Sequence, residues 1–403
     1  MTFVSGPFVR ALRFHHPPQT IASATVGLFL SWRLALWLFA LLAMSIFPAT
    51  PAPTTPTNFF ERTLLSGEAH WYIQLLRQGY SAAIETPPLA AFPPLYPALV
   101  RLVALVVPSW TIAAGLVAHV ALLGAIAYLL ALVGLDGKPP SALRAGIAAL
   151  LWPGSALLGT ISPDSLILLT VTATLYHARR EQWGRAATWA ALAGLTRGMG
   201  VLVFFPLLIT WLLHRPWRDA SPRRVRMSGL IAVAAAPLAF AGFLAFLWWQ
   251  LGSPLAFFRA QELLGSGSLH HPLGLITLAD WKAITSGTAP LVRGYPTDPF
   301  FYRATFIPAI VDAGPLLVGA SAGFWLVWRR RWSEGAFVLA GTILVFAIWG
   351  LPNSAHHLLP FVPIYVALSG WTARPAAGYL VALLGLELLA LSYWLYLNLL
   401  PRL

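Results

Sequence analysis

Long apolar runs separated by short polar segments fill most of this chain. Such runs recur from end to end and include Ile21 to Phe47, Thr111 to Leu135 and Leu230 to Leu251. A stretch of about 20 apolar residues crosses a hydrocarbon core as a helix, because in lipid the backbone must satisfy its own hydrogen bonds. The pattern therefore predicts an all-α polytopic membrane protein with about 10 or 11 transmembrane helices. These helices form a single membrane-embedded domain that covers residues 1–403.

The segment 48–94 breaks the apolar pattern and is expected to form the first external loop. After the Pro- and Thr-rich PATPAPTTPTN, the residues from Phe59 to Tyr80 mix apolar and charged side chains. This mixture is typical of an amphipathic helix that lies along the membrane interface. The Pro-rich FPPLYP then bends the chain toward the next helix. A second long external loop is expected over residues 252–303.

The composition fits a membrane protein and places most of the charge in loops. The chain is 58% hydrophobic and 10% charged, with a formal net charge of +13. Its basic residues gather in short segments such as HARREQWGR and HRPWRDASPRRVR. Because basic loops stay in the cytoplasm, this charge indicates orientation, and we expect no nucleic acid partner. The compact loops favour the cytoplasmic membrane of a prokaryote, with a site that faces outward.

The two basic loops enclose Ala186 to Leu213, which must cross the membrane and return. The only candidate for a turn is LTRG, so Arg197 is expected on the outer face. The loop order places Asp164, in the segment ISPDS, on the same face. If every helix after the first one is counted as a full membrane crossing, however, Asp164 does not come out on the outer face. One of the helices between Leu95 and Leu158 is therefore expected to be partial or re-entrant.

Polar side chains from distant segments are expected to meet on the outer face. An ionisable residue at membrane depth costs roughly 2.5 to 3.5 kcal/mol on insertion scales, so such residues are usually retained for a function. The candidates are Glu68, His70, Asp164, Arg197, His356 and His357. Arg33 and Arg259 would be their neighbours if the helices that contain them turn these side chains inward.

One carboxylate beside several cations at a bilayer surface fits glycosyl transfer from a lipid phosphate sugar. The leaving group is a phosphodiester that departs as a stable anion, so it needs positive charge and no general acid. The acceptor hydroxyl needs one general base, whereas glycoside hydrolysis uses two carboxyl groups. The chain contains no cysteine, which excludes thiolate nucleophiles and thiolate metal sites. The lipid tail of such a donor would explain why the enzyme lies in the membrane.

Six motifs resemble the PIG-V-like mannosyltransferases, membrane enzymes of the GT-C fold. The stretch GEAHWYIQLLRQGY followed by AFPPLYPALVR resembles the family pattern WDGxWYLxIAxxGY and AFFPLYPxLVR. The other motifs follow in the family's order and approximate spacing: SWRLAL at Arg33, SPDSL at Asp164, LAGLTRGMGVL at Arg197, GSPLAFFRAQ at Arg259 and Gln261, and HHLLPFVPIYVAL at His356 and His357. The likeness covers most of the chain.

The resemblance implies an inverting transferase that takes mannose from a polyprenyl phosphate donor on the non-cytoplasmic face. The family's base position falls on Glu68, its aromatic pair on Trp71 and Tyr72, and its basic turn residue on Arg197. Arg197, with help from His356, would then stabilise the leaving phosphate. The expected partners are the polyprenyl phosphate sugar, the bilayer and an acceptor hydroxyl on a glycan, a lipid or a protein. No cofactor and no divalent metal are expected.

Two positions depart from the family pattern. Gly67-Glu68 stands where the family usually has Trp-Asp, so the carboxylate is one methylene longer and an aromatic ring is absent beside it. His356-His357 replaces the family's Arg-Tyr and exchanges a permanent charge for a titratable one. Donor, acceptor or pH dependence is expected to differ accordingly.

Simpler interpretations stay open for several of these residues. Glu68 could be a loop carboxylate that caps a helix, with Glu61 and Glu85 as rivals for the base. Asp164 could be a helix N-cap, and Arg197 could bind lipid headgroups. His270-His271 could suggest a metal, although no DxD or HExxH motif accompanies it.

Two other functions also need membrane spans and buried charges. A transporter or flippase of a lipid-linked sugar is one, although the chain lacks the internal repeats common in transporters. A catalytically silent membrane scaffold is the other. Sugar transfer in detergent, where no compartment exists, would separate the enzyme from both.

Overall fold

The computed structural model describes residues 18–46, 64–65, 68–136, 139–213, 223–266, 306–349 and 354–373, together with Gly378, Val381 and Gly385. Within these residues the regular structure is entirely helical, which confirms the predicted all-α class. Several predictions lie outside the described residues: most of the segment 48–67, including Glu61, most of the loop 252–303, including His270 and His271, and the final span.

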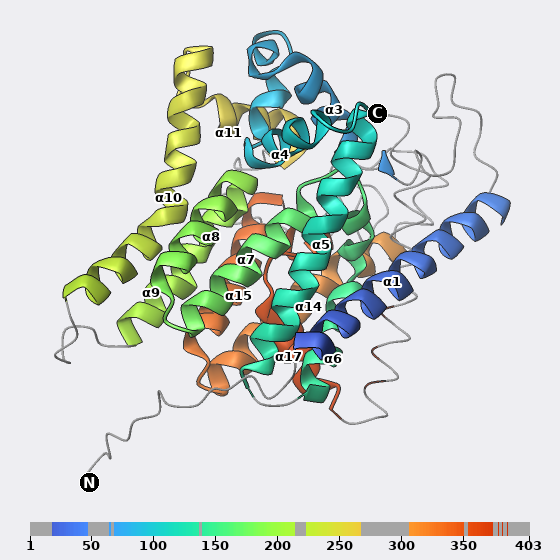
Figure 1. Ribbon diagram of the computed structural model, residues 1–403, viewed down its shortest axis with the longest axis vertical. Helices are drawn as coiled ribbons and strands as arrows, with labels where there is room; N and C mark the ends of the chain where they lie inside the picture. The colour runs from blue at the N-terminus through green and yellow to red at the C-terminus, as the bar shows by residue number, and fades with distance from the viewer. Residues whose placement is uncertain are drawn as a thin grey trace, which may run out of the picture.

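Most helices pack side by side in one bundle (Figure 1). Within it, α10 runs along α8, α5 along α7, and α14 along α15. The bundle helices are α1 (Pro18–Ile46), α5 (Trp110–Gly134), α6 (Pro139–Leu150), α7 (Asp164–Arg179), α8 (Trp183–Thr196), α9 (Phe204–Leu213), α10 (Arg223–Leu251), α14 (Phe306–Trp328), α15 (Trp332–Trp349) and α17 (Pro363–Trp371).

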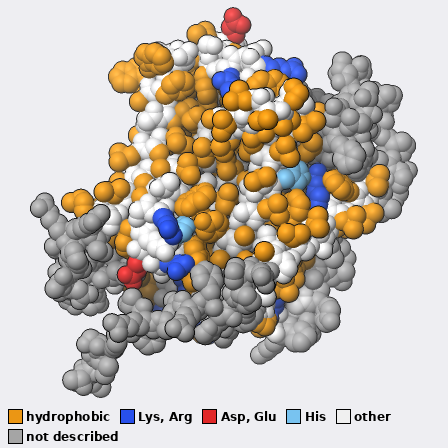
Figure 2. All heavy atoms as spheres, in the orientation of Figure 1, with side chains coloured by type: hydrophobic (Ala, Val, Ile, Leu, Met, Phe, Trp, Pro, Cys, Tyr) orange, Lys and Arg blue, Asp and Glu red, His pale blue; other side chains and the backbone are white. Residues whose placement is uncertain are grey.

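Three described helices are long and apolar enough to cross a membrane: 20–41, 110–134 and 227–251. A fourth crossing is possible if the bent pair formed by α6 and η3 (Pro153–Gly159) acts as one span. Figure 2 shows one face of the molecule covered mainly by hydrophobic side chains, with few charged ones among them. The length and the composition of these helices indicate a membrane protein. The total of about 10 or 11 spans stays a prediction.

A smaller layer of short helices covers one end of the bundle (Figure 1). It contains α3 (Ala69–Gln78), η1 (Tyr80–Ile84), η2 (Pro87–Ala91), α4 (Leu95–Ala104), α11 (Ala256–Gln261) and η5 (Glu262–Ser266). This capping layer has its own apolar core, which includes Tyr72 and Tyr96 and extends to residues at the ends of α5 and α10. The Tyr96 hydroxyl donates to the carbonyl of Ala114 in α5 at 3.1 Å. Arg101 donates from α4 to the carbonyl of Leu76 at 3.2 Å, and so fixes the C-terminal end of α3.

The expectation of a partial helix between Leu95 and Leu158 is confirmed. α4 has only 10 residues and packs in the capping layer against α3 and α5, so it is too short to span. The axis also bends by 81° between α6 and η3. With α4 outside the bundle, the chain reaches Asp164 at the capped end after α5 and the bent pair.

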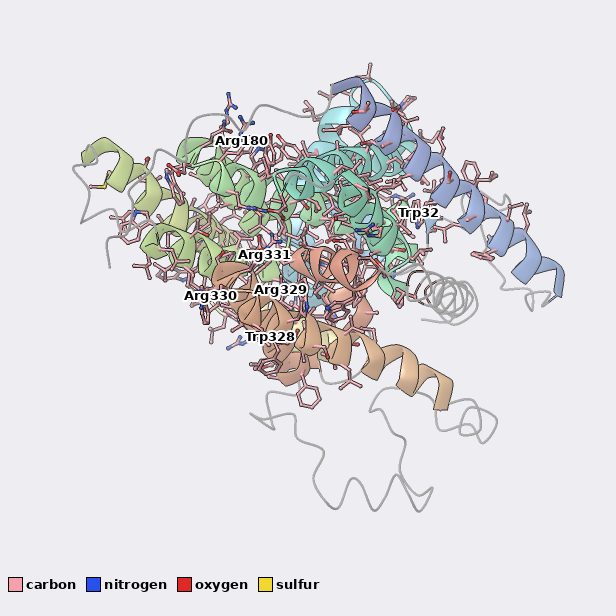
Figure 3. The ribbon with its side chains drawn as sticks, turned by 90° about the horizontal axis from the view of Figure 1, so that it is seen from below. Trp32, Arg180, Trp328, Arg329, Arg330 and Arg331 are labelled. Atoms are coloured by element: carbon pink, nitrogen blue, oxygen red, sulfur yellow. The ribbon has the colours of Figure 1, made fainter. Side chains whose placement is uncertain are left out.

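Charged side chains at the opposite end tie three helix termini together. Arg331, in the turn before α15, binds Asp136 at 3.1 Å and also binds Glu334, while Arg179 at the end of α7 binds Asp136. Figure 3 shows this end, with Arg180 and Arg329 to Arg331 labelled. Burial raises the pKa of the Asp136 carboxyl, but the hydrogen bonds and charges of Arg179 and Arg331 outweigh burial and hold the pKa below its ordinary value.

Candidate functional site

Arg197 lies at the centre of a polar cluster at the capped end of the bundle. α8 ends at Thr196, Arg197 has an extended backbone, and the chain continues in η4 (Gly198–Val203) toward α9. The turn predicted at LTRG is thus present, and the amide of Gly200 closes it by donating to the carbonyl of Arg197 at 2.8 Å. Because Arg197 lies between α8 and η4 and is not part of either helix, its guanidinium reaches the polar cluster.

Glu68 reaches Arg197 from the start of α3. Its backbone carbonyl accepts from the amide of Trp71 at 3.1 Å, whereas its side chain makes no capping hydrogen bond. Instead, Oε2 accepts from Nη2 of Arg197 at 2.7 Å. The Glu68 side chain is 32% exposed, so a substrate could reach its other oxygen. The simple interpretation as a helix cap therefore does not describe this carboxylate.

Asp164 is the most buried member of the cluster, with a side chain 1% exposed. It is the first residue of α7, whose N-cap is Pro163, so the alternative of an N-cap is wrong. Oδ1 accepts from Nη1 of Arg197. Oδ2 is also buried and accepts no hydrogen bond from the described residues. A buried carboxylate oxygen costs free energy until a donor reaches it, so Oδ2 is a candidate contact for a substrate hydroxyl.

His356 completes the cluster from α16 (Ser354–His357). Its Nε2 lies 2.7 Å from Nη1 of Arg197 and 2.9 Å from Oδ1 of Asp164. Nε2 can accept a hydrogen bond from the arginine or donate one to the carboxylate, depending on the tautomer, but it cannot do both at once. His357 stacks on His356 with a centroid separation of 5.0 Å.

Tyr72 forms the apolar wall next to the charges. The ring is 1% exposed and packs edge-on against Phe92 and Tyr96, at 4.8 and 5.1 Å between centroids. Burial, reinforced by the charge of Glu68, raises the pKa of the Tyr72 hydroxyl well above its ordinary value. The hydroxyl therefore stays protonated and cannot serve as the base.

The other predicted site residues lie apart from this cluster. His70 is exposed on α3, where its ring packs against Trp71, and Arg259 is exposed on α11. Gln261 donates to the carbonyl of Ala91 at 3.2 Å and joins α11 to η2. The rival carboxylate Glu85 is exposed after η1. Arg33 is buried in α1, in a crevice of its own.

Two residues that were not among the predicted site residues contact the backbone beside His356. The indole Nε1 of Trp152 donates to the carbonyl of Ala355 at 2.6 Å. Gly154 lies against the same backbone, because a Cβ there would be 2.6 Å from the carbonyl oxygen of Ala355 and 2.9 Å from Cα of His356. The WPG sequence at the start of η3, where Trp152 is the N-cap, is the local signal of this close approach.

Among the described residues, no group of three or more His, Cys, Asp or Glu side chains is placed to hold a metal ion. The cluster instead joins two carboxylates, one guanidinium and one imidazole from four separate helix ends. Such an arrangement can stabilise an anion, take up a proton and bind hydroxyl groups.

The chain matches no protein-family model and no curated protein. Solved structures of the oligosaccharyltransferase from Archaeoglobus fulgidus are similar at 15% identity. The structure tethered with an acceptor peptide gives a TM-score of 0.43 over 91% of this chain, and the complex with Zn and sulfate gives 0.43 over 90%. The complex with an inhibitory peptide and a dolichol-phosphate gives 0.40 over 91%.

This chain spans about half the length of those structures, covering 55%, 53% and 55% of them respectively. At this level of similarity the comparison assigns neither a function nor a site to this chain. The structure by itself defines a helical membrane protein with a capping layer and a buried polar cluster beneath it.

Proposed function

We propose that this protein is a membrane glycosyltransferase of the GT-C type, which moves a sugar from a polyprenyl phosphate donor to an acceptor hydroxyl. The observation that carries the proposal is the cluster of Glu68, Asp164, Arg197 and His356, four residues from distant segments whose side chains meet beneath the capping layer. The six sequence motifs support the PIG-V-like family and mannose as the sugar, and the acceptor is a glycan, a lipid or a protein.

In the proposed reaction the acceptor oxygen attacks the anomeric carbon of the sugar. The bond between that carbon and the phosphate oxygen breaks, and polyprenyl phosphate leaves with the bonding electrons. Glu68 takes the proton of the acceptor hydroxyl, a role that suits its partial exposure. Attack from the face opposite the phosphate inverts the configuration, and no covalent enzyme intermediate forms.

Arg197 stabilises the negative charge of the leaving phosphate. In the structure its guanidinium is already bound by two carboxylates, so a donor phosphate must compete for it. Glu68 is the partner that yields, because it is 32% exposed while Asp164 is 1% exposed. Donor binding thus frees the Glu68 carboxylate, and the base becomes available only when the donor is in place.

Asp164 keeps Arg197 in position and offers its second oxygen to the sugar. Oδ2 is buried beside the cluster and accepts no hydrogen bond from the described residues. A hydroxyl of the transferred sugar would satisfy this oxygen and fix the ring relative to Glu68. His356, whose Nε2 lies within hydrogen-bond distance of both Arg197 and Asp164, offers a second hydrogen bond to the phosphate.

The test uses the full-length protein purified in detergent with synthetic polyprenyl phosphate mannose and a panel of acceptors. The proposal predicts release of polyprenyl phosphate that depends on the acceptor and on Glu68. Detergent removes compartments, so a transporter or flippase would give no product. A scaffold would bind the donor without turnover. Turnover that is unchanged in the Glu68→Gln variant would overturn the assignment of the base.

A further inference from the structure

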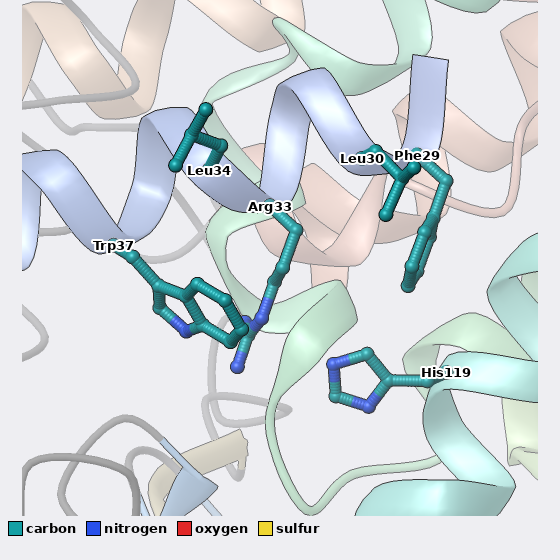
Figure 4. A pocket seen from close by; sticks show the side chains of 6 residues that line it. All are labelled: Phe29, Leu30, Arg33, Leu34, Trp37 and His119. Carbon is teal, nitrogen blue, oxygen red and sulfur yellow. The ribbon is translucent and has the colours of Figure 1, made fainter. Parts of the chain in front are cut away.

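The turn between α14 and α15 presents two arginines at the end of the bundle opposite the Arg197 cluster. Arg329 and Arg330 follow the last residue of α14, and both are exposed. Figure 3 looks onto this end and labels them beside Trp328. By contrast, Arg33 is 5% exposed at the crevice in Figure 4, and Arg197 binds two carboxylates. At the turn, positive charge reaches the surface of the bundle.

Arg330 has a backbone conformation that is unfavourable for any residue with a side chain. Its φ is 61°, in the left-handed region where glycine is usual. The amide of Arg330 donates to the carbonyl of Val327, and that of Arg331 to the carbonyl of Leu326, both at 2.9 Å. This is the pattern of a Schellman cap with Arg330 at the glycine position, so the backbone alone satisfies the end of α14. Because an arginine there costs conformational energy, we expect its side chain to have a function.

Arg331, the next residue, holds the turn in place. It binds Asp136 at 3.1 Å and also binds Glu334. The two helices are in close contact as well, since a Cβ on Gly335 would be 2.6 Å from Cγ2 of Val327. A turn fixed in this way does not have to be ordered when a ligand binds, so little conformational entropy is lost on binding.

The charges of Arg329 and Arg330 are not balanced by this network. Within the part of the chain that the structure describes, neither side chain forms an ion pair with a carboxylate. Arg329 lies over the Trp325 ring, with 5.2 Å from its guanidinium carbon to the ring centre, but a ring is not a counter-anion. A helix C-terminus carries roughly half an elementary negative charge, which balances two arginines incompletely. The turn is therefore suited to an anionic ligand.

Exposed aromatic side chains indicate that this ligand is a lipid. Trp328 is 83% exposed and Trp332 is 49% exposed, on either side of the three arginines. Phe324 and Leu317 are also exposed, and their spacing places them on the same face of α14 as Trp328. Tryptophan gathers at membrane interfaces, where arginine extends toward the headgroups. A soluble acidic protein or a nucleic acid would leave this apolar stripe uncovered, whereas a phospholipid contacts both the arginines and the stripe.

We propose that the turn between α14 and α15 binds an anionic phospholipid. Arg329 and Arg330 bind its phosphate, Trp328 lies at the level of the glycerol, and an acyl chain follows the exposed stripe of α14. Phosphatidylcholine is disfavoured because its choline cation would meet the same two arginines. The basic segment HARREQWGR, which ends α7 at this end of the bundle, predicts the cytoplasmic side, where the leaflet contains anionic lipids. The inference does not depend on the proposed transferase activity.

The experiment maps the lipid directly. The full-length protein is reconstituted in phosphatidylcholine nanodiscs with a trace of phosphatidylglycerol that carries a photoreactive group at the start of one acyl chain. Labelled peptides are then identified by mass spectrometry, and we expect labels between Phe324 and Trp332. Unlabelled phosphatidylglycerol should remove these labels, whereas zwitterionic phosphatidylethanolamine should not. Equal competition by the two lipids, or no label between Phe324 and Trp332, would overturn the inference.

Arg330→Gly separates lipid binding from folding. Glycine adopts the left-handed conformation without strain, so Tm in phosphatidylcholine should not fall. The affinity for phosphatidylglycerol should nevertheless fall about fivefold, the equivalent of roughly 1 kcal/mol for one basic residue at an anionic surface. Arg330→Lys should retain most of the affinity because the charge remains. Arg329→Gln should weaken binding to a similar extent, and combining it with Arg330→Gly should weaken binding further.

Arg77→Gln is the matched control. Arg77 is also an exposed arginine in the last turn of a helix, but it lies on α3 in the capping layer. Its replacement should leave the labels at the turn between α14 and α15 unchanged. An equal loss in Arg77→Gln would show that net charge, and not this turn, attracts the lipid. Unchanged labelling in the combined Arg329→Gln and Arg330→Gly variant would contradict the site.

Discussion

Oε2 of Glu68 accepts a hydrogen bond from Nη2 of Arg197 at 2.7 Å, although the two residues are 129 positions apart in the chain. The same guanidinium binds the buried carboxylate of Asp164. The proposed base and the proposed phosphate ligand are thus paired in this structure. In the proposed reaction a donor phosphate separates them by taking the place of Glu68 on Arg197.

Replacing Glu68 by glutamine should slow sugar transfer by about 10² to 10⁴-fold, because the amide cannot take the proton of the acceptor. Binding of the donor should change much less than turnover. The measurement is release of polyprenyl phosphate at saturating donor. Glu85→Gln is the matched control, since Glu85 is an exposed carboxylate in the same capping layer. A loss of activity as large in Glu85→Gln as in Glu68→Gln would count against the assignment.

Replacing Arg197 by glutamine should destabilise the protein, because Asp164 would stay buried without its positive partner. Breaking a buried pair from one side costs about 3–5 kcal/mol. Adding Asp164→Asn to Arg197→Gln should recover part of the loss, since the uncompensated charge is then removed. Thermal unfolding in detergent, followed for both single variants and the double variant, measures this coupling. Additive losses would mean that the two side chains do not interact.

Arg197→Lys keeps the charge but cannot span two carboxylates with a planar guanidinium. We expect near-normal thermal stability with a clear loss of transfer rate, because the lysine can pair with Asp164 but no longer aligns the phosphate against Glu68. Measuring unfolding and turnover on the same preparation separates the two effects. Wild-type turnover in this variant would show that charge alone suffices at this position.

Gly154→Ala should impair catalysis through the position of His356. The added methyl would meet the backbone of Ala355 at 2.6 Å and push α16 away from the cluster. A displacement of this kind can reduce a rate by up to about 10²-fold. Turnover is compared with that of Gly184→Ala, because a Cβ on Gly184 meets nothing within 4 Å. Gly184→Ala should behave as wild type.

Asp136→Asn should lower the free energy of unfolding near neutral pH. It should also make the free energy of unfolding depend less on pH in the acid range. The folded-state pKa of Asp136 lies below its ordinary value of 3.8, so the carboxylate contributes stability above that value and loses the contribution as the pH falls through the folded-state pKa. Thermal unfolding of wild type and variant between about pH 3 and pH 7 tests this. The difference in stability should shrink toward acid; a constant difference contradicts the ion-pair explanation.

The sequence by itself determined the helical class, the interruption by an amphipathic segment and the turn at Arg197. These features are local, because long apolar runs and a basic residue between them dictate where a membrane helix starts and ends. The count along the chain also required a partial helix before Asp164, which α4 in the capping layer supplies. The candidate residues Glu68, Asp164, Arg197 and His356 came from charge at membrane depth together with family motifs.

Only the tertiary structure decided which of the candidates meet. Asp164 is the first residue of α7 and its carboxylate binds Arg197, while Arg33 lies at a separate crevice and Arg259 is exposed. Trp152 and Gly154 carry no charge and still set the position of His356. The rotation of each helix and the packing of its ends determine these contacts. Both depend on residues far apart in the chain, so a hydropathy pattern, which is local, contains no information on them.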